Sequence, residues 1–303
     1  MKTVKTKHRV LVTGASGFLG SSVLEVLSKK PLEVIALGHS ADTAREINEQ
    51  GNVTWKFADI CDKDALRDTL EGCDTVIHLV GLLTECPKKG ITHQRVVVEG
   101  SQCLAEACAD SGVRKIIYVS AAGTNSQSRS VYHQSKWKAE SIVKSSGLAW
   151  TIFRPSLLFF SRAAKDYSGC RKDFVATIVQ QFRWLPFVAL PGSGNSLCQP
   201  LCVTDLSNAI VNAIESGDHE VVDAGGPEKY SYTRLFQDIS RANFKLKCVL
   251  HLPMWIMKFL AKAVFAKMTS PPLSYDQLLM LEDDNLADPL SDHFLFEGDL
   301  SRW

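Results

Sequence analysis

The sequence predicts an α/β protein with a doubly wound parallel sheet and a smaller C-terminal α+β domain. Three observations support this fold class. A short apolar run at 10–12 leads directly into Gly14, Gly17 and Gly20, and a helical pattern follows. A second apolar run begins at residue 34, which is the distance expected of a βαβ unit. Further strand-length and helix-length segments then alternate as far as residue 154.

The length and composition suit one large domain or two closely packed ones. The chain has 303 residues, of which 45% are hydrophobic, so a sizeable core can form. We expect a dinucleotide-binding domain over residues 1–158. We expect a smaller substrate or partner domain over 159–303, with parts of 200–225 packing back on the first domain.

Charge and hydropathy argue against several classes of function. Lys plus Arg total 34 and Asp plus Glu total 33, whereas a nucleic-acid-binding protein would show a basic excess. No apolar run approaches the ~20 residues of a membrane span, and the run near the N-terminus is too short for a signal peptide. The cysteines form no C-x-x-C pair. We therefore expect a cytoplasmic protein with free thiols and no metal site.

The glycine-rich stretch has the arrangement that a bound pyrophosphate needs. A strand, a tight turn and a helix start follow one another, so backbone N–H groups and the positive end of the helix dipole face the phosphates. The spacing G-x-x-G-x-x-G resembles the cofactor motif of the extended short-chain dehydrogenase/reductases. The cofactor-binding residues expected here are Gly14, Ser16, Gly17, Phe18, Leu19 and Gly20.

The residues after the second strand bear on the choice between NAD(H) and NADP(H). An acidic residue at this strand end binds the ribose hydroxyls of NAD, but here Asp42 comes late. His39, Ser40 and Arg45 can instead face a 2′-phosphate, which slightly favours NADP(H). The alternative is that His39 and Arg45 are ordinary solvated residues at the start of a helix.

The third strand, expected at 53–57, leads into a candidate adenine contact. Asp59 and Ile60 follow it, and in the extended reductases an aspartate at this position meets the adenine amino group. The alternative is that Asp59 or Asp62 caps the helix expected over 62–70.

The fourth strand, expected at 75–81, ends in Val80 and Gly81. The resemblance implies that this strand end lies against the cofactor ribose, and a glycine there allows a close approach. A long helix over 91–111 and a fifth strand over 114–120 complete the alternation before the next motif.

Tyr132 and Lys136 are placed four residues apart on a helix expected over 132–145. This spacing brings both side chains to one helix face. A phenol with a pKa near ~10 transfers protons poorly at neutral pH, unless a neighbouring ammonium lowers that pKa. Lys136 can also hold the nicotinamide ribose while Tyr132 gives or takes a proton at a substrate oxygen. The family places its Tyr/Lys pair on the helix before the sixth strand, here expected at 149–154.

The resemblance is incomplete on the substrate side. Ala122 stands where the family has a serine or threonine, so Ser120 or Thr124 would supply the hydroxyl group. Pro155 matches the strand end that passes the nicotinamide, but the usual glycine a few residues later is Phe160. The sequence therefore names no substrate.

The C-terminal half is similar to that of one subgroup of the family. The segments that carry this resemblance are Pro-Gly-Ser-Gly at 191–194, Gln-Pro at 199–200, Gly-Gly-Pro-Glu at 225–228, Leu-Pro at 252–253 and Tyr-Asp-Gln-Leu-Leu at 275–279. The subgroup consists of atypical extended reductases, similar to NAD-dependent epimerases and dehydratases. It includes the nucleotide-binding accessory subunit of respiratory complex I and its stand-alone bacterial relatives. The subgroup often lacks the catalytic hydroxyl residue, as Ala122 implies here.

The segment 252–268 has the pattern of a basic amphipathic helix. One interpretation is that it contacts a membrane surface or a protein partner, which would make the protein a peripheral membrane protein. The other is that it packs on its own domain with its lysines in solvent. The acidic tail from Glu282 is expected to be loosely ordered.

The sequence supports two functions. The first is an NAD(P)-dependent oxidoreductase or epimerase-like enzyme, in which Tyr132 and Lys136 act on an unknown small molecule with a carbonyl or hydroxyl group. The second is a non-catalytic NADP(H)-binding structural or sensing protein of a respiratory or membrane complex. The Tyr/Lys pair favours the enzyme, whereas Ala122, Phe160 and the basic helix favour the second function.

Overall fold

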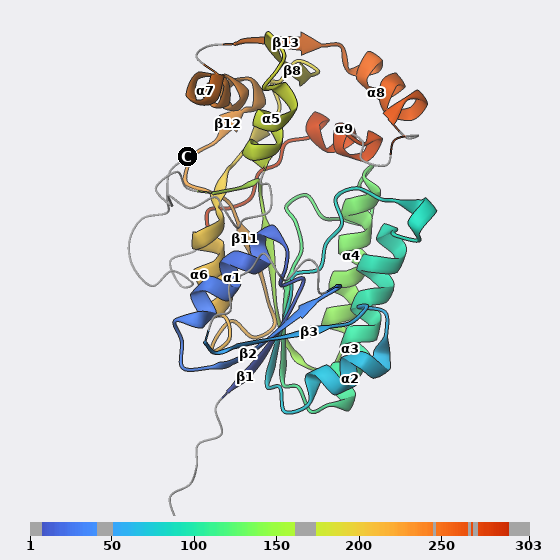
Figure 1. The fold of residues 1–303 in the computed structure, drawn as a ribbon, viewed down its shortest axis with the longest axis vertical. Helices are drawn as coiled ribbons and strands as arrows, with labels where there is room; N and C mark the ends of the chain where they lie inside the picture. The colour runs from blue at the N-terminus through green and yellow to red at the C-terminus, as the bar shows by residue number, and fades with distance from the viewer. Residues whose placement is uncertain are drawn as a thin grey trace, which may run out of the picture.

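A seven-stranded parallel sheet forms the centre of the molecule (Figure 1). The structure is a computed structural model that describes residues 8–40, 51–160, 174–244, 247–265, 268 and 272–290. The strand order is β11-β6-β5-β4-β1-β2-β3, and every neighbouring pair is parallel. The predicted fold class is therefore confirmed. The strands are β1 (Arg9–Thr13), β2 (Glu33–Gly38), β3 (Val53–Phe57), β4 (Thr75–His78), β5 (Lys115–Val119), β6 (Ala149–Pro155) and β11 (Glu220–Ala224).

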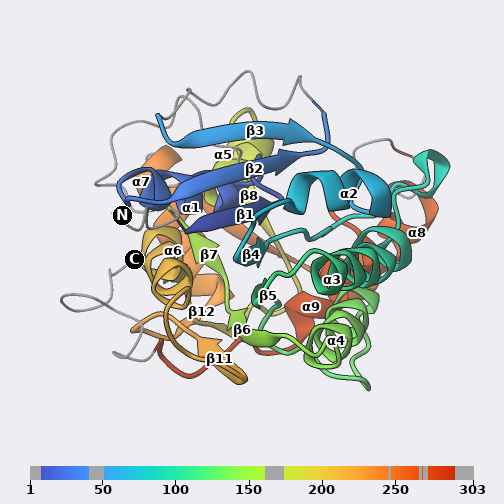
Figure 2. The same ribbon diagram turned by 90° about the horizontal axis from the view of Figure 1, so that it is seen from below.

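Helices cover both faces of this sheet, as Figure 2 shows. One face carries α1 (Phe18–Ser28) and α6 (Val203–Asn212), and the other carries α2 (Lys63–Leu70), α3 (Gly100–Asp110) and α4 (Val131–Lys144). A short 3-10 helix, η2 (Pro87–Lys89), precedes a π-helical segment, η3 (Gln94–Glu99), that runs directly into α3. The long helix predicted here is therefore one helical run with a change of pitch.

The two covered faces explain why the central strands β1, β4 and β5 are buried almost throughout. Successive strand residues point to opposite faces, so a strand covered on both sides buries every residue. In β1, Val10 and Val12 pack with α1 and α6, whereas Leu11 packs with the α2 and α3 side. Two separate hydrophobic cores result, one on each side of the sheet.

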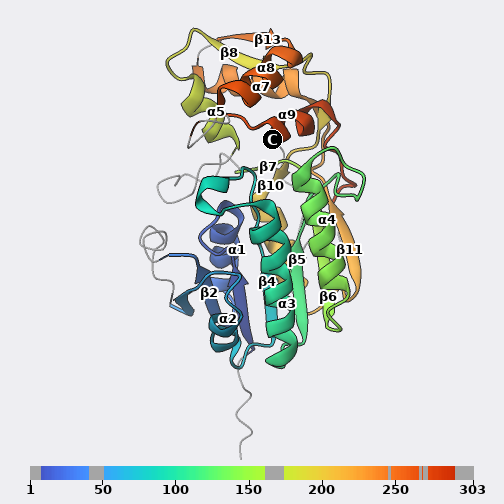
Figure 3. The same cartoon turned by 90° about the vertical axis from the view of Figure 1, so that its right-hand side faces the viewer.

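The C-terminal elements gather beyond the carboxyl ends of the parallel strands (Figures 1 and 3). Three two-stranded sheets pair β10 with β7, β12 with β9 and β13 with β8. The helices there are α5 (Phe174–Phe182), α7 (Tyr232–Phe244), α8 (Met254–Ala263) and α9 (Tyr275–Glu282). The short strands are β7 (Leu158–Phe159), β8 (Phe187–Pro191), β9 (Leu197–Cys198), β10 (Leu201–Cys202), β12 (Tyr230–Ser231) and β13 (Cys248–Leu252). A third hydrophobic core joins α5, β8 and α7.

Residues 282–290 are anchored, so the loose tail predicted from Glu282 is wrong over this range. Asn285 donates its backbone N–H to the carbonyl oxygen of Leu197 at 2.8 Å. Leu290 donates to the carbonyl oxygen of Gly225 at 3.1 Å, and its side chain is only 3% exposed. Backbone pairing and one buried leucine outweigh the acidic composition from which disorder was predicted.

Two absences hold for the described part of the chain. No helix there is long and apolar enough to cross a lipid bilayer. Within the same residues, no three His, Cys, Asp or Glu side chains gather in a group that could hold a metal ion.

A buried ion pair ties α4 to the sheet. Arg154 on β6 donates two hydrogen bonds, of 2.9 and 2.7 Å, to the two carboxylate oxygens of Glu140 on α4. Glu140 is 1% exposed, and Lys144 lies 3.6 Å from it on the same helix. The pair therefore fixes the helix that carries Tyr132 and Lys136.

We predict that Arg154→Met lowers the free energy of unfolding by about 3 kcal/mol, because it leaves a buried carboxylate without its main partner. Replacing both members, as Arg154→Met with Glu140→Leu, should recover most of that loss. Urea denaturation followed by circular dichroism measures both variants. Equal losses in the single and double variants would contradict this prediction.

Candidate functional site

The candidate site lies where the order of the strands reverses, between β1 and β4. Ligands of doubly wound sheets bind at this point, outside the carboxyl ends of the strands. The turn after β1 is closed by a hydrogen bond of 2.9 Å from the N–H of Gly17 to the carbonyl oxygen of Gly14. Helix α1 then begins at Phe18, and the N–H groups of its first turn lack partners within the helix. This is the arrangement that the glycine motif predicted.

At two positions of the motif, close backbone contacts leave no room for any residue larger than glycine. Gly14 has a φ of +68°, and a Cβ atom there would lie 3.0 Å from the backbone of Leu79 and of Val80. A Cβ atom on Gly20 would collide with the carbonyl oxygen of Gly14. The glycine turn therefore packs directly on the chain that leaves β4, next to Gly81.

The other motif residues lie at the same turn. Ser16, Phe18 and Leu19 are half-buried. The ring of Phe160 lies beside that of Phe18, with 6.3 Å between the ring centroids. Phe160, which stands where the family has a glycine, therefore lies against the start of α1.

The residues predicted for the ribose 2′ position are only partly described. His39 follows β2 directly and is exposed, and Ser40 is half-buried. Arg45 lies outside the described residues, so the structure does not bear on its predicted contact with a 2′-phosphate.

Asp59 is held by two contacts at the end of β3. Its carboxylate accepts the backbone N–H of Cys61 at 3.0 Å and pairs with Arg95 at 2.6 Å. The helix cap is Asp62, which accepts the N–H of Ala65, so the alternative role considered for Asp59 is excluded. Ile60, 8% exposed, packs closely on Gly100 at the start of α3, where a Cβ atom would lie 2.7 Å from the Ile60 side chain.

Tyr132 and Lys136 are both buried on α4, at 9% and 2% exposure. The ammonium of Lys136 donates to the carbonyl oxygen of Val119, at the end of β5, at 2.8 Å. It also donates to the carbonyl oxygen of Val80, beyond β4, at 3.3 Å. A Cβ atom on Gly81 would lie 3.3 Å from the same nitrogen. The structure thus brings together four of the predicted site residues: Val80, Gly81, Tyr132 and Lys136.

Burial, and not the neighbouring charge, governs the acidity of this pair. Burial raises the pKa of Tyr132 to about 12. Burial also lowers the pKa of Lys136 to about 7, against an opposing effect of Glu140. The prediction that Lys136 lowers the pKa of the phenol is therefore wrong, because burial raises that pKa instead. The physical reason is that both groups lose their water and Lys136 directs its N–H groups to backbone carbonyls.

The candidate hydroxyl groups lie at the end of β5. Ser120 and Thr124 are 3% and 7% exposed, and the Ser120 hydroxyl donates to that of Thr124 at 3.3 Å. Between them, Ala122 donates its backbone N–H to the carbonyl oxygen of Pro155 at 2.8 Å. The two hydroxyls and the end of β6 are therefore neighbours, as the order of the strands predicts.

Two residues beside Tyr132 were not anticipated from the sequence. Asp276 on α9 accepts the backbone N–H of Tyr132 at 3.1 Å. The ring of His93 lies 5.9 Å from the ring of Tyr132, between centroids, and its buried Nδ1 has no hydrogen-bond partner among the described residues. His93 belongs to no motif. Asp276 lies in the segment 275–279 that carries the subgroup resemblance, but only the folded chain brings it to a tyrosine so distant in sequence.

Comparisons with known proteins identify the family of this chain. The family model described as NAD dependent epimerase/dehydratase matches residues 10–225. The mouse (Mus musculus) protein NADH dehydrogenase (ubiquinone) 1 alpha subcomplex subunit 9, mitochondrial, is 27% identical over 259 residues, which are 83% of this chain. UDP-N-acetyl-alpha-D-glucosaminuronate decarboxylase of Bacillus cytotoxicus is 25% identical over 278 residues, 82% of this chain and 84% of that protein.

Solved structures extend the likeness to the fold. UDP-glucuronic acid 4-epimerase from Bacillus cereus, in complex with UDP-glucuronic acid and NAD, superposes with a TM-score of 0.67 at 19% identity. The match covers 90% of this chain and 97% of the epimerase. By contrast, the match with the mouse relative spans only 65% of that relative's length.

We predict that Lys136 makes the stability of the protein depend on pH. Its pKa of about 7 in the folded state lies below the 10.5 of an unperturbed lysine. Below pH 7 both states are protonated, and the folded state carries the full cost of the buried charge. That cost declines as the pH rises from 7 towards 10.5, because the folded state then holds the amine neutral.

The variant Lys136→Met keeps the apolar bulk and removes the titration. The free energy of unfolding of the variant, relative to that of wild type, should be highest below pH 7. This difference should fall by about 1.4 kcal/mol for each pH unit between 7 and 10. The variant also loses the two hydrogen bonds of Lys136, which changes the difference in free energy of unfolding by an amount that does not depend on pH. Urea denaturation of both proteins at several pH values measures the difference, and a constant difference would contradict the prediction.

Proposed function

Because the chain belongs to the NAD-dependent epimerase/dehydratase family, we propose that it is an NAD(P)-dependent oxidoreductase or epimerase acting on a carbonyl or hydroxyl substrate. The observation that carries this proposal is the position of Lys136. Its ammonium is buried at the carboxyl ends of β4 and β5, beside the glycine turn and on the same helix as Tyr132. Burying an ammonium costs free energy, and titratable groups with strongly shifted pKa values concentrate at functional sites.

The residues at this edge fit a nicotinamide dinucleotide. The close-packed turn at Gly14 leaves backbone and helix N–H groups for a pyrophosphate. When bound, the nicotinamide supplies or accepts a hydride. In this proposal Asp59 and Ile60 border the adenine, and Val80, Gly81 and Pro155 lie along the ribose and nicotinamide.

We propose NADP(H) as the preferred form of the cofactor over NAD(H). The described residues that follow β2 are His39 and Ser40, neither of which is acidic. An acidic residue there would repel a 2′-phosphate, whereas an exposed imidazole can donate a hydrogen bond to one. In the sequence, Arg45 adds a positive charge a few residues later.

Tyr132 moves the proton that accompanies hydride transfer. Its phenol donates a proton to the substrate oxygen when a carbonyl is reduced and takes one back when a hydroxyl is oxidised. Lys136 has three N–H donors, and two are directed to Val119 and Val80. In this proposal the third is directed to the cofactor ribose. Ser120 and Thr124 orient the substrate oxygen in place of the hydroxyl that Ala122 lacks.

We predict that Tyr132→Phe lowers turnover by about 100-fold or more, because the phenol of Tyr132 supplies the transferred proton in this proposal. Its affinity for the dinucleotide should stay near that of wild type. Gly14→Ala should lose that affinity, since a side chain there is strained at a φ of +68°. Nicotinamide fluorescence measures NADPH and NADH binding, and a panel of sugar nucleotides and carbonyl compounds tests turnover.

The outcomes of this test are distinct. Wild-type protein that binds a dinucleotide but turns over nothing in the panel would favour the non-catalytic alternative. Turnover that survives in Tyr132→Phe would remove the tyrosine from the mechanism. Failure to bind either dinucleotide would contradict the proposed cofactor site itself.

A second candidate function is a nucleotide-binding protein held at a membrane surface, and α8 is the observation that favours it. Two large apolar side chains one turn apart on α8 are exposed, Trp255 at 73% and Phe259 at 65%. The sequence between Asp238 and Asp276 contains no acidic residue, whereas it contains several lysines. Aromatic side chains beside lysines suit the interface of an anionic membrane. The mouse relative is named as a subunit of NADH dehydrogenase, which is consistent with attachment to a larger assembly.

If this candidate is correct, the protein will float with vesicles that contain anionic lipids and much less with neutral ones. The double variant Trp255→Ser with Phe259→Ser should lose most of that binding. Trp137→Ser on α4, where the tryptophan is 39% exposed, is the matched control and should bind as wild type does. Flotation that is equal for neutral and anionic vesicles, or unchanged in the double variant, would exclude α8 as the contact.

A further inference from the structure

The N-terminus of α4 is closed by a carboxylate from a distant part of the chain. Asp276, in the first turn of α9, accepts the backbone N–H of Val131 at 2.8 Å and that of Tyr132 at 3.1 Å. It also accepts the hydroxyl of Ser130, the N-cap residue of α4, at 2.8 Å. One side chain therefore binds three consecutive residues at the start of the helix that carries the Tyr/Lys pair.

These three contacts are hydrogen bonds to a charged group, which are stronger than those between neutral groups. The first N–H groups of a helix have no partners within it, and the helix dipole adds positive potential at that end. A carboxylate that accepts several such N–H groups forms charge-assisted hydrogen bonds. Ser130 extends the network, because its oxygen accepts the N–H of His133 at 3.3 Å while its hydroxyl donates to Asp276.

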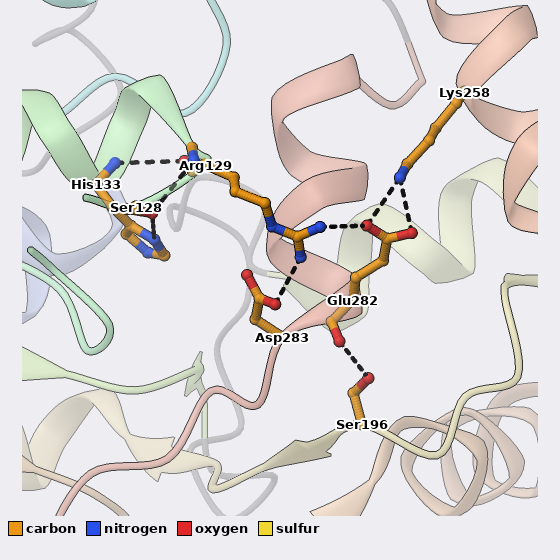
Figure 4. Close-up of polar contacts among 8 residues, drawn as sticks. Ser128, Arg129, His133, Ser196, Lys258, Glu282 and Asp283 are labelled. Carbon is orange, nitrogen blue, oxygen red and sulfur yellow. Dashed lines mark hydrogen bonds and ion pairs between the residues drawn. The ribbon is translucent and has the colours of Figure 1, made fainter.

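A second contact joins the same two segments a few ångströms away. Arg129, just before α4, donates to Asp283 at 2.7 Å and to Glu282 at 3.3 Å (Figure 4). Glu282 also accepts two hydrogen bonds from Lys258 of α8, of 2.7 and 2.8 Å. These side chains are partly exposed, so each pair by itself contributes little to stability. Their effect is to hold the end of α9 against the loop that leads into α4.

Tyr132 is the second residue of α4, so its backbone belongs to the turn that Asp276 binds. The phenol is buried, and its direction follows from the backbone of this turn and from contact with the rings of His93 and His133, whose centroids lie 5.9 and 5.4 Å from that of Tyr132. A helix end that frays would let the Tyr132 backbone move while Lys136, one turn further on, stays bound to β4 and β5. The relation between phenol and ammonium thus depends on the first turn staying closed.

We infer that Asp276 is a positioning residue for the reaction: from α9 it holds the first turn of α4 closed and so sets the position of the Tyr132 phenol relative to Lys136. This inference rests on the proposed catalytic role of Tyr132. It assigns the C-terminal part of the chain a direct part in building the site, because the reacting tyrosine is correctly placed only when α9 is docked.

The experiment compares Asp276→Ala and Asp276→Asn with a matched control, Asp283→Asn. The control removes a carboxylate from the same junction, but Asp283 makes its hydrogen bond to Arg129, which precedes α4, and makes none to the N–H groups of the first turn among the described residues. Asp276→Asn keeps one oxygen that can accept an N–H of the helix, so it should be intermediate between Asp276→Ala and wild type. Far-UV circular dichroism confirms that each variant is folded.

The first readout does not need turnover. The protein has six tyrosines, and labelling with 3-fluorotyrosine gives a fluorine resonance for each. The resonance that is missing in Tyr132→Phe belongs to Tyr132. In Asp276→Ala that resonance should shift and broaden, or split into two, whereas in Asp283→Asn it should stay at the wild-type position. An unchanged Tyr132 resonance in a folded Asp276→Ala protein would overturn the inference.

The second readout separates positioning from binding. For a substrate that wild type turns over, kcat of Asp276→Ala should fall by roughly 100-fold, as expected of a reacting group displaced by about 1 Å. The KM for the dinucleotide should stay near that of wild type, and kcat should recover in part in Asp276→Asn. A raised KM with an unchanged kcat would contradict a positioning role. If wild type has no turnover at all, the proposed enzyme function fails, while the fluorine spectra still decide whether Asp276 positions the phenol.

Discussion

The reversal of strand order between β1 and β4 is the constraint on which the rest of the structure depends. The connections that follow these two strands run to opposite faces of the sheet. Neither connection therefore covers the crevice between the carboxyl ends of β1 and β4. The turn at Gly14 packs on the chain beyond β4 at this edge, and α1 begins there. Lys136 reaches the same edge from α4 on the other face. The turn proposed to hold the pyrophosphate and the lysine proposed to hold the ribose are both placed by this topological feature.

Burial determines the electrostatics of the site. Lys136 is surrounded by backbone carbonyls and by the ring of Tyr118, 4.8 Å from its ammonium. With little water near either group, the phenol of Tyr132 keeps its proton and the ammonium of Lys136 gives its proton up more readily. The same burial explains the bidentate pair of Glu140 and Arg154, without which α4 would carry an unpaired charge into the core.

The C-terminal elements connect the two candidate functions. Glu282 at the end of α9 binds Lys258 of α8 and Arg129 before α4, and Asp276 binds the first turn of α4. The exposed aromatic face of α8 and the buried tyrosine are therefore linked through one short helix, α9. An enzyme and a surface-attached nucleotide-binding protein would use this connection differently. In the first, α9 supports the reacting tyrosine, and in the second it joins the nucleotide site to the attached surface.

Local sequence determined much of this protein. The glycine spacing, the apolar strands and the four-residue interval from Tyr132 to Lys136 follow from backbone sterics and periodicity, which act over a few residues and can be recognised without the fold. Only the tertiary structure decided that Asp276 closes α4, that Asp59 pairs with Arg95, and that residues 282–290 return to the sheet. It also decided the pKa values of Tyr132 and Lys136. The physical reason is that desolvation and long-range hydrogen bonds depend on what surrounds a group in space, and a one-dimensional pattern holds no information about those surroundings.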